Sequence, residues 1–538
     1  MADAKILVHP AFRIGTISPR IYGAFLEPIG TMVNGCMYNP RHPSADGKGF
    51  RQDFIKALKE AGLKAIRLPG GNFVSGWDWK DSIGPLSERK AHLDPAWFQY
   101  IPNDVGHDEY LQWAECIGAE SMYTVNLGTG TIRDAMDAVE YTNHPEGTYW
   151  SDLRRKNGHP TPYGVKTWYL GNEMDGPWQI GSWEKDPRGY GVMAHEVSKA
   201  MKWTDPGIET AACASSSPFL AHYPQWDLEV LQECYETVDY LSLHHYHSAP
   251  AGDWAALLGG SCYFEDYIRT ETALCDFVQA KMRSPRKIML SFDEYGTMAR
   301  PCSKLNPGYG PHNLAAAHYR FDPDRKYLRY DPDNMSNARQ YPQQSDMFDA
   351  LTAASTLLVF LRHADRVKIA CMTHGINSLA AADRLHVWKA GAHYPLTQLM
   401  QYGRGVSLRT AVEGPTFDLP GYAIDDNSQY QSREGLPYLD TAAAAQEEKG
   451  ELCIFVINRH PQDEICAEID VSAFSGYELT EHIQMYSSDP DATSTWEHPD
   501  AVVPEVNTET KQAGGTVKAG FAPLSWNVLR FSLPMKKA

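Results

Sequence analysis

Eight short apolar segments recur along the first two-thirds of the chain, and stretches with helical periodicity separate them. Short strands that alternate with helices are typical of repeated strand–helix–strand units, which build a parallel sheet. Eight such units are the number that a closed parallel barrel requires. The segments are Ile21–Phe25, Lys64–Arg67, Ser121–Val125, Lys166–Leu170, Ile208–Ala212, Val238–Leu243, Lys287–Ser291 and Val367–Ala370. We therefore predict an α/β fold, a (β/α)8 TIM barrel, over residues 16–390.

The segments between these strands carry clear helix signals. Phe50, Phe54, Leu58 and Ala61 fall on one helical face, and Gly62 follows them where a helix commonly ends on a left-handed residue. A second apolar helix is predicted over Phe348–Leu361, directly before the last strand of the barrel.

The pattern changes after about residue 395, where helical periodicity fades. Short apolar segments such as Leu452–Asn458 and Ser525–Leu533 lie there among turn residues. A chain of 538 residues is also longer than a barrel alone needs. We predict an antiparallel, jelly-roll-like β-sandwich over residues 391–538, with the alanine run Ala442–Ala445 in a polar loop.

Charge and hydropathy narrow the classes of function. The formal net charge of −18 disfavours nucleic acid or an anionic membrane as partners, because both need a basic surface. The N-terminus has no apolar stretch of secretory length, and no run of about 18 apolar residues occurs elsewhere. The ten cysteines are scattered without a C-x-x-C pair, as in proteins with reduced thiols. We predict a cytoplasmic protein without nucleic-acid or membrane partners.

Two glutamates stand where predicted strands meet the carboxyl end of the barrel, the end at which such barrels carry their active sites. Glu173 follows the fourth strand within Gly171–Trp178, and Glu294 follows the seventh within Phe292–Gly296. Two carboxyl groups flanking one bond are the minimum for glycoside hydrolysis, with one protonated and the other ionised. A lone glutamate at a strand end is often only a solvated surface residue. The occurrence of two at facing strands favours catalysis.

Other strand ends offer the polar and aromatic groups that suit a sugar, because its hydroxyls need hydrogen-bond partners and its C–H face packs on aromatic rings. Glu27 follows the first strand, Asn72 follows the second, and Asn172 and Trp178 flank Glu173. We expect a carbohydrate substrate.

The run His244–His247 suggests zinc as an alternative. Strand alternation, however, sends His244 and Tyr246 to one face and His245 and His247 to the other. No cysteine or carboxylate lies nearby at a metal-motif spacing, so we expect no metal and no cofactor.

These segments resemble the family 51 glycoside hydrolases, the α-L-arabinofuranosidases of the clan A barrels. The likeness extends over almost the whole chain and is strongest at Leu170–Gln179, with further matches at Arg67–Gly76, Asn126–Thr131 and Arg362–Lys368. It implies Glu173 as acid/base and Glu294 as nucleophile of a retaining mechanism. It also implies Glu27, Asn72, Asn172 and Tyr246 around the terminal furanose, a strand over residues 1–15 that joins the sandwich, and a homo-oligomer, commonly a hexamer.

The chain departs from the family pattern near the expected pocket. Ala24 and Pro28 stand where the family usually has histidines, and Tyr295-Gly296 follows the nucleophile where it usually has Trp-Asn. His374 aligns with a glutamine that the family offers to the sugar, and residues 298–341 match no family segment.

The sequence therefore predicts an exo-acting α-L-arabinofuranosidase. The nearest alternative is a related clan A glycosidase with the same acid pair, such as a β-xylosidase, a galactofuranosidase or an endo-glucanase. A carbohydrate-binding barrel without catalysis and a metal hydrolase built on the histidine run are two further alternatives.

Overall fold

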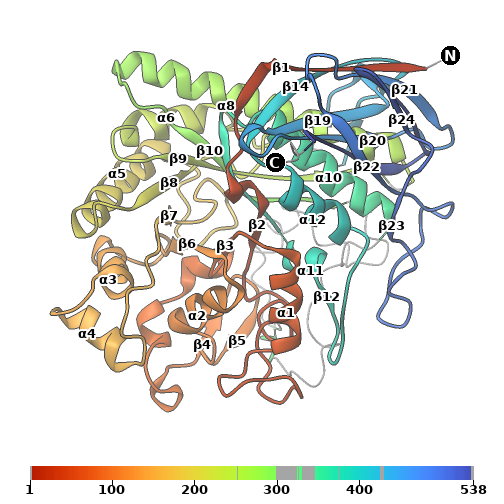
Figure 1. The fold of residues 1–538 in the computed structure, drawn as a ribbon. Coiled ribbons are helices and arrows are strands. Elements are labelled where there is room, and N and C mark those ends of the chain that lie inside the picture. The colour runs from red at the N-terminus through yellow and green to blue at the C-terminus, as the bar shows by residue number, and fades with distance from the viewer. Residues whose placement is uncertain are drawn as a thin grey trace.

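The computed structural model describes residues 3–250, 252–298, 324, 326–329, 346–373, 375–424 and 429–534. Its centre is a closed barrel of eight parallel strands, ordered β10-β11-β2-β3-β6-β7-β8-β9 around the ring (Figure 1). The strands are β2 (Gly23–Phe25), β3 (Ala65–Leu68), β6 (Glu120–Val125), β7 (Thr167–Leu170), β8 (Glu209–Cys213), β9 (Tyr240–Ser248), β10 (Met289–Met298) and β11 (Val367–Met372). The predicted barrel is confirmed.

Helices surround this barrel and cover the outward faces of its strands. They include α1 (Gln52–Ala61), α2 (His107–Ile117), α3 (Ile132–Asn143), α5 (Pro187–Thr204), α6 (Gln225–Cys234), α8 (Ser261–Met282) and α10 (Met347–Arg362). The large apolar core lies between strands and helices. Gly62 ends α1 in the left-handed conformation, with φ of 80°, as its place after the apolar face predicted.

The barrel interior is closed at the amino end of the strands by one charged cluster. Arg20 donates to Glu120 at 2.6 Å and to Glu209 at 2.7 Å, which joins the loop before β2 to β6 and β8. Above this cluster lies a layer of apolar side chains that includes Phe25, Met122 and Tyr169. The polar groups of the interior are therefore concentrated at the other end.

Three sequence predictions need correction. The first strand begins at Gly23, because Ile21 and Tyr22 belong to the 3-10 helix η1 (Pro19–Tyr22), which Pro19 starts. Strands β9 and β10 run several residues further than predicted, so His244–His247 and Asp293-Glu294 lie inside strands and not after them. Their polar residues resemble a loop in sequence, but His244 and Tyr246 face the acids in the interior, whereas His245 and His247 are buried on the opposite face of β9.

The C-terminal part forms a ten-stranded, mostly antiparallel sheet in the order β23-β22-β26-β20-β19-β14-β1-β21-β25-β24. Its strands are β23 (Pro504–Val506), β22 (Glu478–Met485), β26 (Ser525–Ser532), β20 (Glu451–Asn458), β19 (Leu439–Gln446), β14 (Val406–Glu413), β1 (Ala4–Thr16), β21 (Ile465–Asp470), β25 (Thr516–Phe521) and β24 (Lys511–Ala513). Gln512 of β24 bonds to Tyr477 and Leu479 at the opposite end of the sheet, which therefore folds over on itself around a second apolar core.

The N-terminal strand lies in this sheet, as the red strand among the blue ones in Figure 1 shows. Strand β1 pairs antiparallel with β14 and parallel with β21. The boundaries 1–15, 16–390 and 391–538 stay a prediction.

The alanine run was predicted wrongly as part of a loop, since Ala442–Ala445 form the buried centre of β19. Ala442 and Ala444 pack into the core on the barrel side, whereas Ala443 and Ala445 pack into the core inside the sheet. A strand buried on both faces shows no alternation of polar and apolar residues, so its sequence lacks the usual strand signal.

We expect one ion pair between barrel and sheet to dominate their attachment. Arg362, at the end of α10, donates to Asp440 of β19 at 2.7 Å and to Glu265 of α8 at 2.8 Å. Burial opposes ionisation of Asp440, and Arg362 nevertheless holds its pKa below the ordinary value. Arg362→Met should lower the free energy of unfolding by about 3 kcal/mol, because a buried carboxylate loses its charge partner.

Chemical denaturation measures this loss. Arg13→Met is the control, because Arg13 and Glu447 form a pair with both side chains about half exposed. Arg13→Met should lower the free energy of unfolding by less than about 1 kcal/mol. Equal losses in both variants would contradict the expected role of the buried pair.

Candidate active site

The structure brings Glu173 and Glu294 together at the carboxyl end of the barrel. Glu173 lies in the segment after β7, beyond Gly171 and Asn172, and Glu294 lies within β10; both side chains are buried. An oxygen of each carboxyl group, together with a ring nitrogen of His244, falls within a group whose atoms all lie within 4.8 Å of one another. Two acids far apart in sequence thus share one small space.

Arg67 of β3 organises this space. Its fully buried guanidinium donates to Glu294 Oε1 at 2.7 Å and to Asn172 Oδ1 at 2.7 Å, and its Nε lies 2.9 Å from Asp293 Oδ2. The rings of Phe25 and Tyr169 lie about 5 Å from the guanidinium carbon. Arg67 therefore fixes the carboxylate of Glu294 relative to the segment that carries Glu173.

His244 of β9 lies between the acids. Its Nδ1 is 2.9 Å from Glu173 Oε1 and 3.7 Å from Glu294 Oε2, and its Nε2 is 3.2 Å from Asp293 Oδ2. Burial lowers the pKa of His244, but the charges of Glu294 and Asp293 and the bond to Glu173 outweigh it and raise the pKa to about 10. His244 is a cation at neutral pH.

This charge state bears on metal binding. Glu173, His244 and Glu294 are close enough to share an ion, but an imidazolium with a proton on each nitrogen has no lone pair for a metal. The other histidines of the run face away, since His245 packs beside Phe264 and His247 bonds to the Ala256 carbonyl. Of the three histidines of the run, only His244 belongs to the group with Glu173 and Glu294, so the run does not bring its histidines together as ligands of one ion.

Glu173 is held in an unusual backbone conformation, with φ of 45°. Its Oε2 accepts a hydrogen bond from Trp178 Nε1 at 2.6 Å. Two residues later, Asp175 anchors the segment to the loop after β8, where it accepts from Ser216 N at 2.9 Å and faces His222 Nε2 at 3.1 Å. Burial raises the pKa of Glu173, although His244 and Trp178 oppose this shift. A raised pKa favours the protonated acid.

Glu294 has a different environment. Besides Arg67 at Oε1, Tyr246 donates to its Oε2 at 2.7 Å. The Tyr246 hydroxyl also lies 2.8 Å from Thr373 Oγ1, at the end of β11. A guanidinium and a phenol both favour an ionised carboxylate. Sequence reasoning missed Thr373, although it stands at a strand end like the residues that were found.

Glu27 lies buried after β2, close enough to Glu294 for the two charges to interact. Its Oε1 accepts from Phe73 N at 2.8 Å and from Trp97 Nε1 at 2.8 Å. Burial, with the nearby charge of Glu294, raises the pKa of Glu27 to about 8. Trp97 was not predicted, because it lies in the long segment between β3 and β6 and not at a strand end.

The two predicted asparagines contact each other. Asn172 Nδ2 donates to Asn72 Oδ1 at 3.0 Å, and Gln179 Nε2 donates to the same oxygen. Gln179 in turn accepts from Ser75 Oγ at 2.9 Å. The amides of Asn72 and Asn172 are therefore fixed in orientation beside Arg67.

The structure describes the surroundings of Ala24, Pro28, Tyr295 and Gly296, four residues at which the chain departs from the family pattern. Ala24 packs against the start of α11 (Gly375–Leu379), where a side chain on Gly375 would lie 3.2 Å from the Ala24 Cβ. Tyr295 points away from the acids into a buried aromatic group with Phe264 and Phe360. A side chain on Gly296 would lie 3.6 Å from the Tyr246 ring, and Gln99 donates to the carbonyl of Pro28.

His374 and most of residues 298–341 lie outside the described residues.

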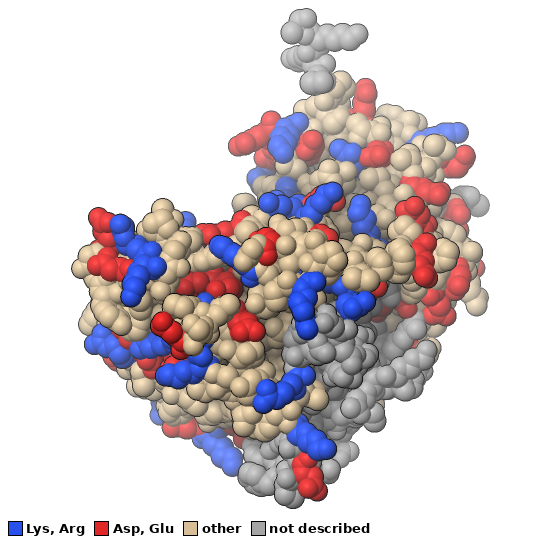
Figure 2. All heavy atoms as spheres, turned by 90° about the horizontal axis from the view of Figure 1, so that it is seen from below, with Lys and Arg blue, Asp and Glu red and all other residues tan. Residues whose placement is uncertain are grey.

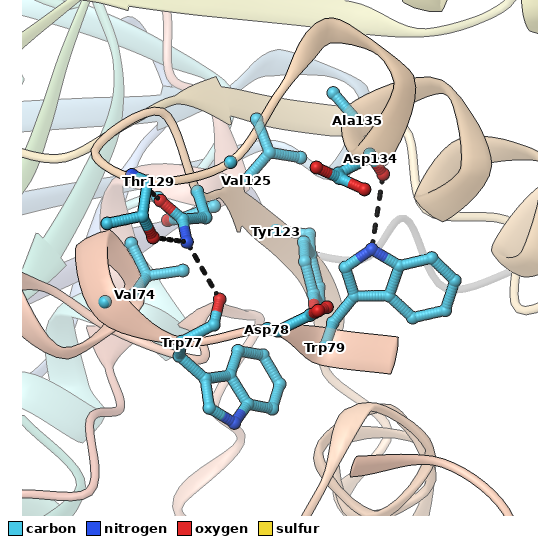
Figure 3. Close-up of a pocket in the computed structure, with 13 residues that line it drawn as sticks. Val74, Trp77, Asp78, Trp79, Tyr123, Val125, Thr129, Asp134 and Ala135 are labelled. Atoms are coloured by element: carbon cyan, nitrogen blue, oxygen red, sulfur yellow. Dashed lines mark hydrogen bonds between the residues drawn. The ribbon is translucent and has the colours of Figure 1, made fainter. Parts of the chain in front are cut away.

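A separate cavity of about 160 Å3 lies beyond the 3-10 helix η2 (Asn72–Gly76), against the start of α3 (Figure 3). Its polar groups bond mainly to one another: Asn126 donates to the Trp77 carbonyl and to Thr129, and Trp79 donates to the Asp134 carbonyl. None of the predicted site residues lines it. The acid pair and this cavity are therefore distinct sites.

The face of the molecule in Figure 2 carries acidic and basic side chains intermixed, without a continuous basic field. Within the described ranges, no helix is long and apolar enough to cross a membrane.

Comparison with known proteins gives consistent matches. The family described as "Alpha-L-arabinofuranosidase 1 domain" matches residues 57–263, and "Alpha-L-arabinofuranosidase C-terminal domain" matches residues 293–525. The chain is 38% identical over 536 residues to the Bacillus subtilis (strain 168) "Intracellular exo-alpha-(1->5)-L-arabinofuranosidase 1", covering 98% of this chain and 99% of that protein. It is 32% identical to a Bifidobacterium longum "Exo-alpha-(1->6)-L-arabinofuranosidase", covering 98% and 97%.

Among solved structures, an α-L-arabinofuranosidase from Thermotoga maritima in an arabinose complex superimposes with a TM-score of 0.83 at 28% identity. The match covers 98% of this chain and 100% of that one.

The approach of Gly71 to Glu27 yields a test of the site's packing. Gly71 has φ of 82°, and a Cβ there would lie 2.5 Å from the Glu27 carboxyl group. Gly71→Ala should destabilise the fold by about 1–3 kcal/mol more than the same substitution at a glycine with a similar φ and open surroundings.

Gly84 is the matched control, with φ of 81° and no atom nearer than 3.9 Å to its added Cβ. Thermal unfolding of Gly71→Ala and Gly84→Ala compares a crowded glycine with an open one at nearly the same φ. Equal unfolding temperatures would refute the close packing of Glu27 on the glycine pair.

Proposed function

The chain belongs to the family 51 α-L-arabinofuranosidases, and we propose that it releases terminal α-L-arabinofuranosyl residues from oligosaccharides or small glycosides by double displacement. This is the activity of a non-reducing end α-L-arabinofuranosidase, EC 3.2.1.55.

The spacing of the two acids carries the proposal for the mechanism. Retaining glycosidases hold their carboxyl groups about 5–5.5 Å apart, whereas inverting enzymes leave about 6.5–9.5 Å for a water molecule. Glu173 and Glu294 have oxygens within 4.8 Å of each other, which supports retention of configuration.

The environments of the acids assign their roles. Glu173, with its raised pKa, holds the proton that the departing oxygen needs. Glu294, held by Arg67 and Tyr246, attacks the anomeric carbon, and the bond to the leaving oxygen breaks as Glu173 protonates it. Glu173, now ionised, removes a proton from water, which attacks the same carbon and frees Glu294.

The surrounding groups suit the terminal sugar. We assign Glu27, Asn72, Asn172, Tyr246 and Trp178 to its binding, and His374 by family likeness alone. With a pKa of about 8, Glu27 is protonated at neutral pH, so its carboxyl group can donate as well as accept a hydrogen bond. Asn172 Nδ2 carries a second proton for the hydroxyl next to the anomeric carbon, a contact that strengthens as positive charge develops there.

For the linkage, we propose α-(1→5). Four relatives at 36–38% identity are named for this linkage, whereas the relative named for α-(1→6) is 32% identical. A related glycosidase activity with the same acid pair is the alternative. Aryl arabinofuranosides, galactofuranosides and xylosides assayed side by side distinguish these substrates.

Two further proposals concern the protein in the cell. We propose an intracellular enzyme, as the names of these relatives state for them. We also propose a homo-oligomer, a hexamer by family likeness, and light scattering of the purified protein would measure its mass.

Substitution of the two glutamates tests their roles. Glu294→Ala should lose nearly all turnover. Glu173→Ala should lose about 10²–10⁴-fold on substrates with poor leaving groups and much less on activated aryl glycosides. Azide should accelerate Glu173→Ala by attacking the glycosyl-enzyme, and the glycosyl azide product should retain the substrate configuration.

The azide product is identified by NMR. An inverted azide from Glu173→Ala, or full activity in Glu294→Ala, would disprove the assignment.

The bond from Trp178 to Glu173 yields a pH prediction. A hydrogen bond to the ionised carboxylate lowers the pKa of Glu173, so its loss in Trp178→Phe should raise that pKa further. The alkaline limb of kcat/KM reports loss of the acid's proton in the free enzyme, and it should therefore move to higher pH.

Trp526→Phe is the control, because the Trp526 indole donates at 2.6 Å to the neutral side chain of Gln398. The control should keep the wild-type pH profile of kcat/KM. A shift of the Trp178→Phe limb to lower pH, or no shift, would contradict the predicted direction.

A further inference from the structure

Thr373 contacts the nucleophile's hydrogen-bonding partner but has no assigned role. It directly follows β11, the eighth strand of the barrel, and its side chain is buried. Its backbone N–H donates at 2.8 Å to the carbonyl of Tyr295, the residue after Glu294. The backbone alone therefore continues the pairing of β11 with β10, and the hydroxyl is not needed for that pairing.

The hydroxyl of Thr373 is instead aimed at Tyr246. Thr373 Oγ1 and Tyr246 Oη are 2.8 Å apart, and Tyr246 Oη is 2.7 Å from Glu294 Oε2. A phenol has one proton, and an ionised carboxylate can only accept. If Glu294 is the ionised nucleophile, Tyr246 gives its proton to Glu294, and the proton between Tyr246 and Thr373 must come from Thr373.

We propose that Thr373 is a positioning residue for the nucleophile, through an ordered chain of hydrogen bonds from Thr373 to Tyr246 to Glu294. The inference rests on the proposed role of Glu294. The Thr373 hydroxyl occupies the acceptor side of the Tyr246 oxygen, which directs the phenol proton to Glu294 and strengthens that bond, because hydrogen bonds in a chain polarise one another.

This chain of hydrogen bonds completes the support of both carboxylate oxygens of Glu294. Arg67 of β3 donates to Glu294 Oε1, and Tyr246 of β9 donates to Glu294 Oε2. Thr373, after β11, supports Tyr246, so the plane of the Glu294 carboxylate is held from both sides. Without the Thr373 proton, Tyr246 can turn its own proton towards Thr373, and Glu294 then loses a donor. Thr373 thus contacts Tyr246 and acts through it.

Thr373→Val tests the proposal, because valine keeps the shape of threonine and removes only the hydroxyl. We expect kcat to fall about 5–10-fold, the effect of one neutral hydrogen bond, with little change in KM. The acid limb of kcat/KM should move to higher pH, because the carboxylate loses stabilisation of its charged form. Thr373→Ser keeps a hydroxyl, so its kcat and the acid limb of its kcat/KM should lie close to those of the wild type.

Two controls separate this role from a structural one. Thr356→Val removes another buried hydroxyl, one that donates to the Thr352 carbonyl within α10, and it should leave kcat and the pH profile unchanged. In a Tyr246→Phe background, Thr373→Val should have no further effect, since the hydroxyl has lost the group through which it acts.

The kinetics of the Thr373 variants decide whether the proposal stands. The proposal would be overturned if Thr373→Val kept the wild-type kcat and the wild-type acid limb of kcat/KM. It would also be overturned if Thr373→Val lowered kcat equally in the wild-type and Tyr246→Phe backgrounds. Failure of the proposed function is visible separately, as full activity in Glu294→Ala or as the absence of arabinofuranoside hydrolysis by the wild-type enzyme.

Discussion

The buried guanidinium of Arg67 is the interaction on which the arrangement of the site depends. A fully buried cation needs anions and acceptors within reach, and Arg67 has three: Asp293, Glu294 and Asn172. Such a network contributes little net stability, because desolvation offsets much of the attraction. Its contribution is geometric, since it ties β3 to β10 and to the segment after β7 that carries Glu173.

Barrel closure makes this network possible. Glu173 and Glu294 lie on strands that are not neighbours in the ring, with β8 and β9 between them. Only a closed barrel turns such strands towards a common interior. The apolar layer of Phe25, Met122 and Tyr169, with the Arg20 cluster below it, fills the rest of that interior and confines the remaining charges to the carboxyl end.

Much of this was predictable, for physical reasons. The eight strands show as apolar segments because the outward face of each packs under helices, and the helix stop at Gly62 follows from glycine's access to positive φ. The longer course of β9 and β10 was not predicted, because both strands carry polar residues that resemble a loop. His244, Asp293 and Glu294 are accepted there only because the interior holds compensating groups, whereas His245 and His247 are buried on the outer side of β9. Ala442–Ala445 gave no strand signal because β19 is buried on both faces. Trp97 reaches the site through a tertiary contact, for which one sequence holds no period or spacing. Thr373 stands at a strand end and was missed because the last strand was predicted to end at Ala370, whereas β11 continues to Met372.

Charge balance explains why buried acids at the carboxyl end of the barrel have different pKa shifts. Among the described residues at the carboxyl end of the barrel, the cations Arg67 and His244 form ion pairs with Asp293, and Arg67 also pairs with Glu294. Each further ionised carboxylate would add an uncompensated buried charge. Glu173 and Glu27, whose other donors are the neutral groups of Trp178, Trp97 and Phe73, therefore have raised pKa values. Arg67 thus binds Glu294 directly, whereas burial raises the pKa of Glu173 within 4.8 Å of it, and such a difference in environment is what an acid and a nucleophile in one site require.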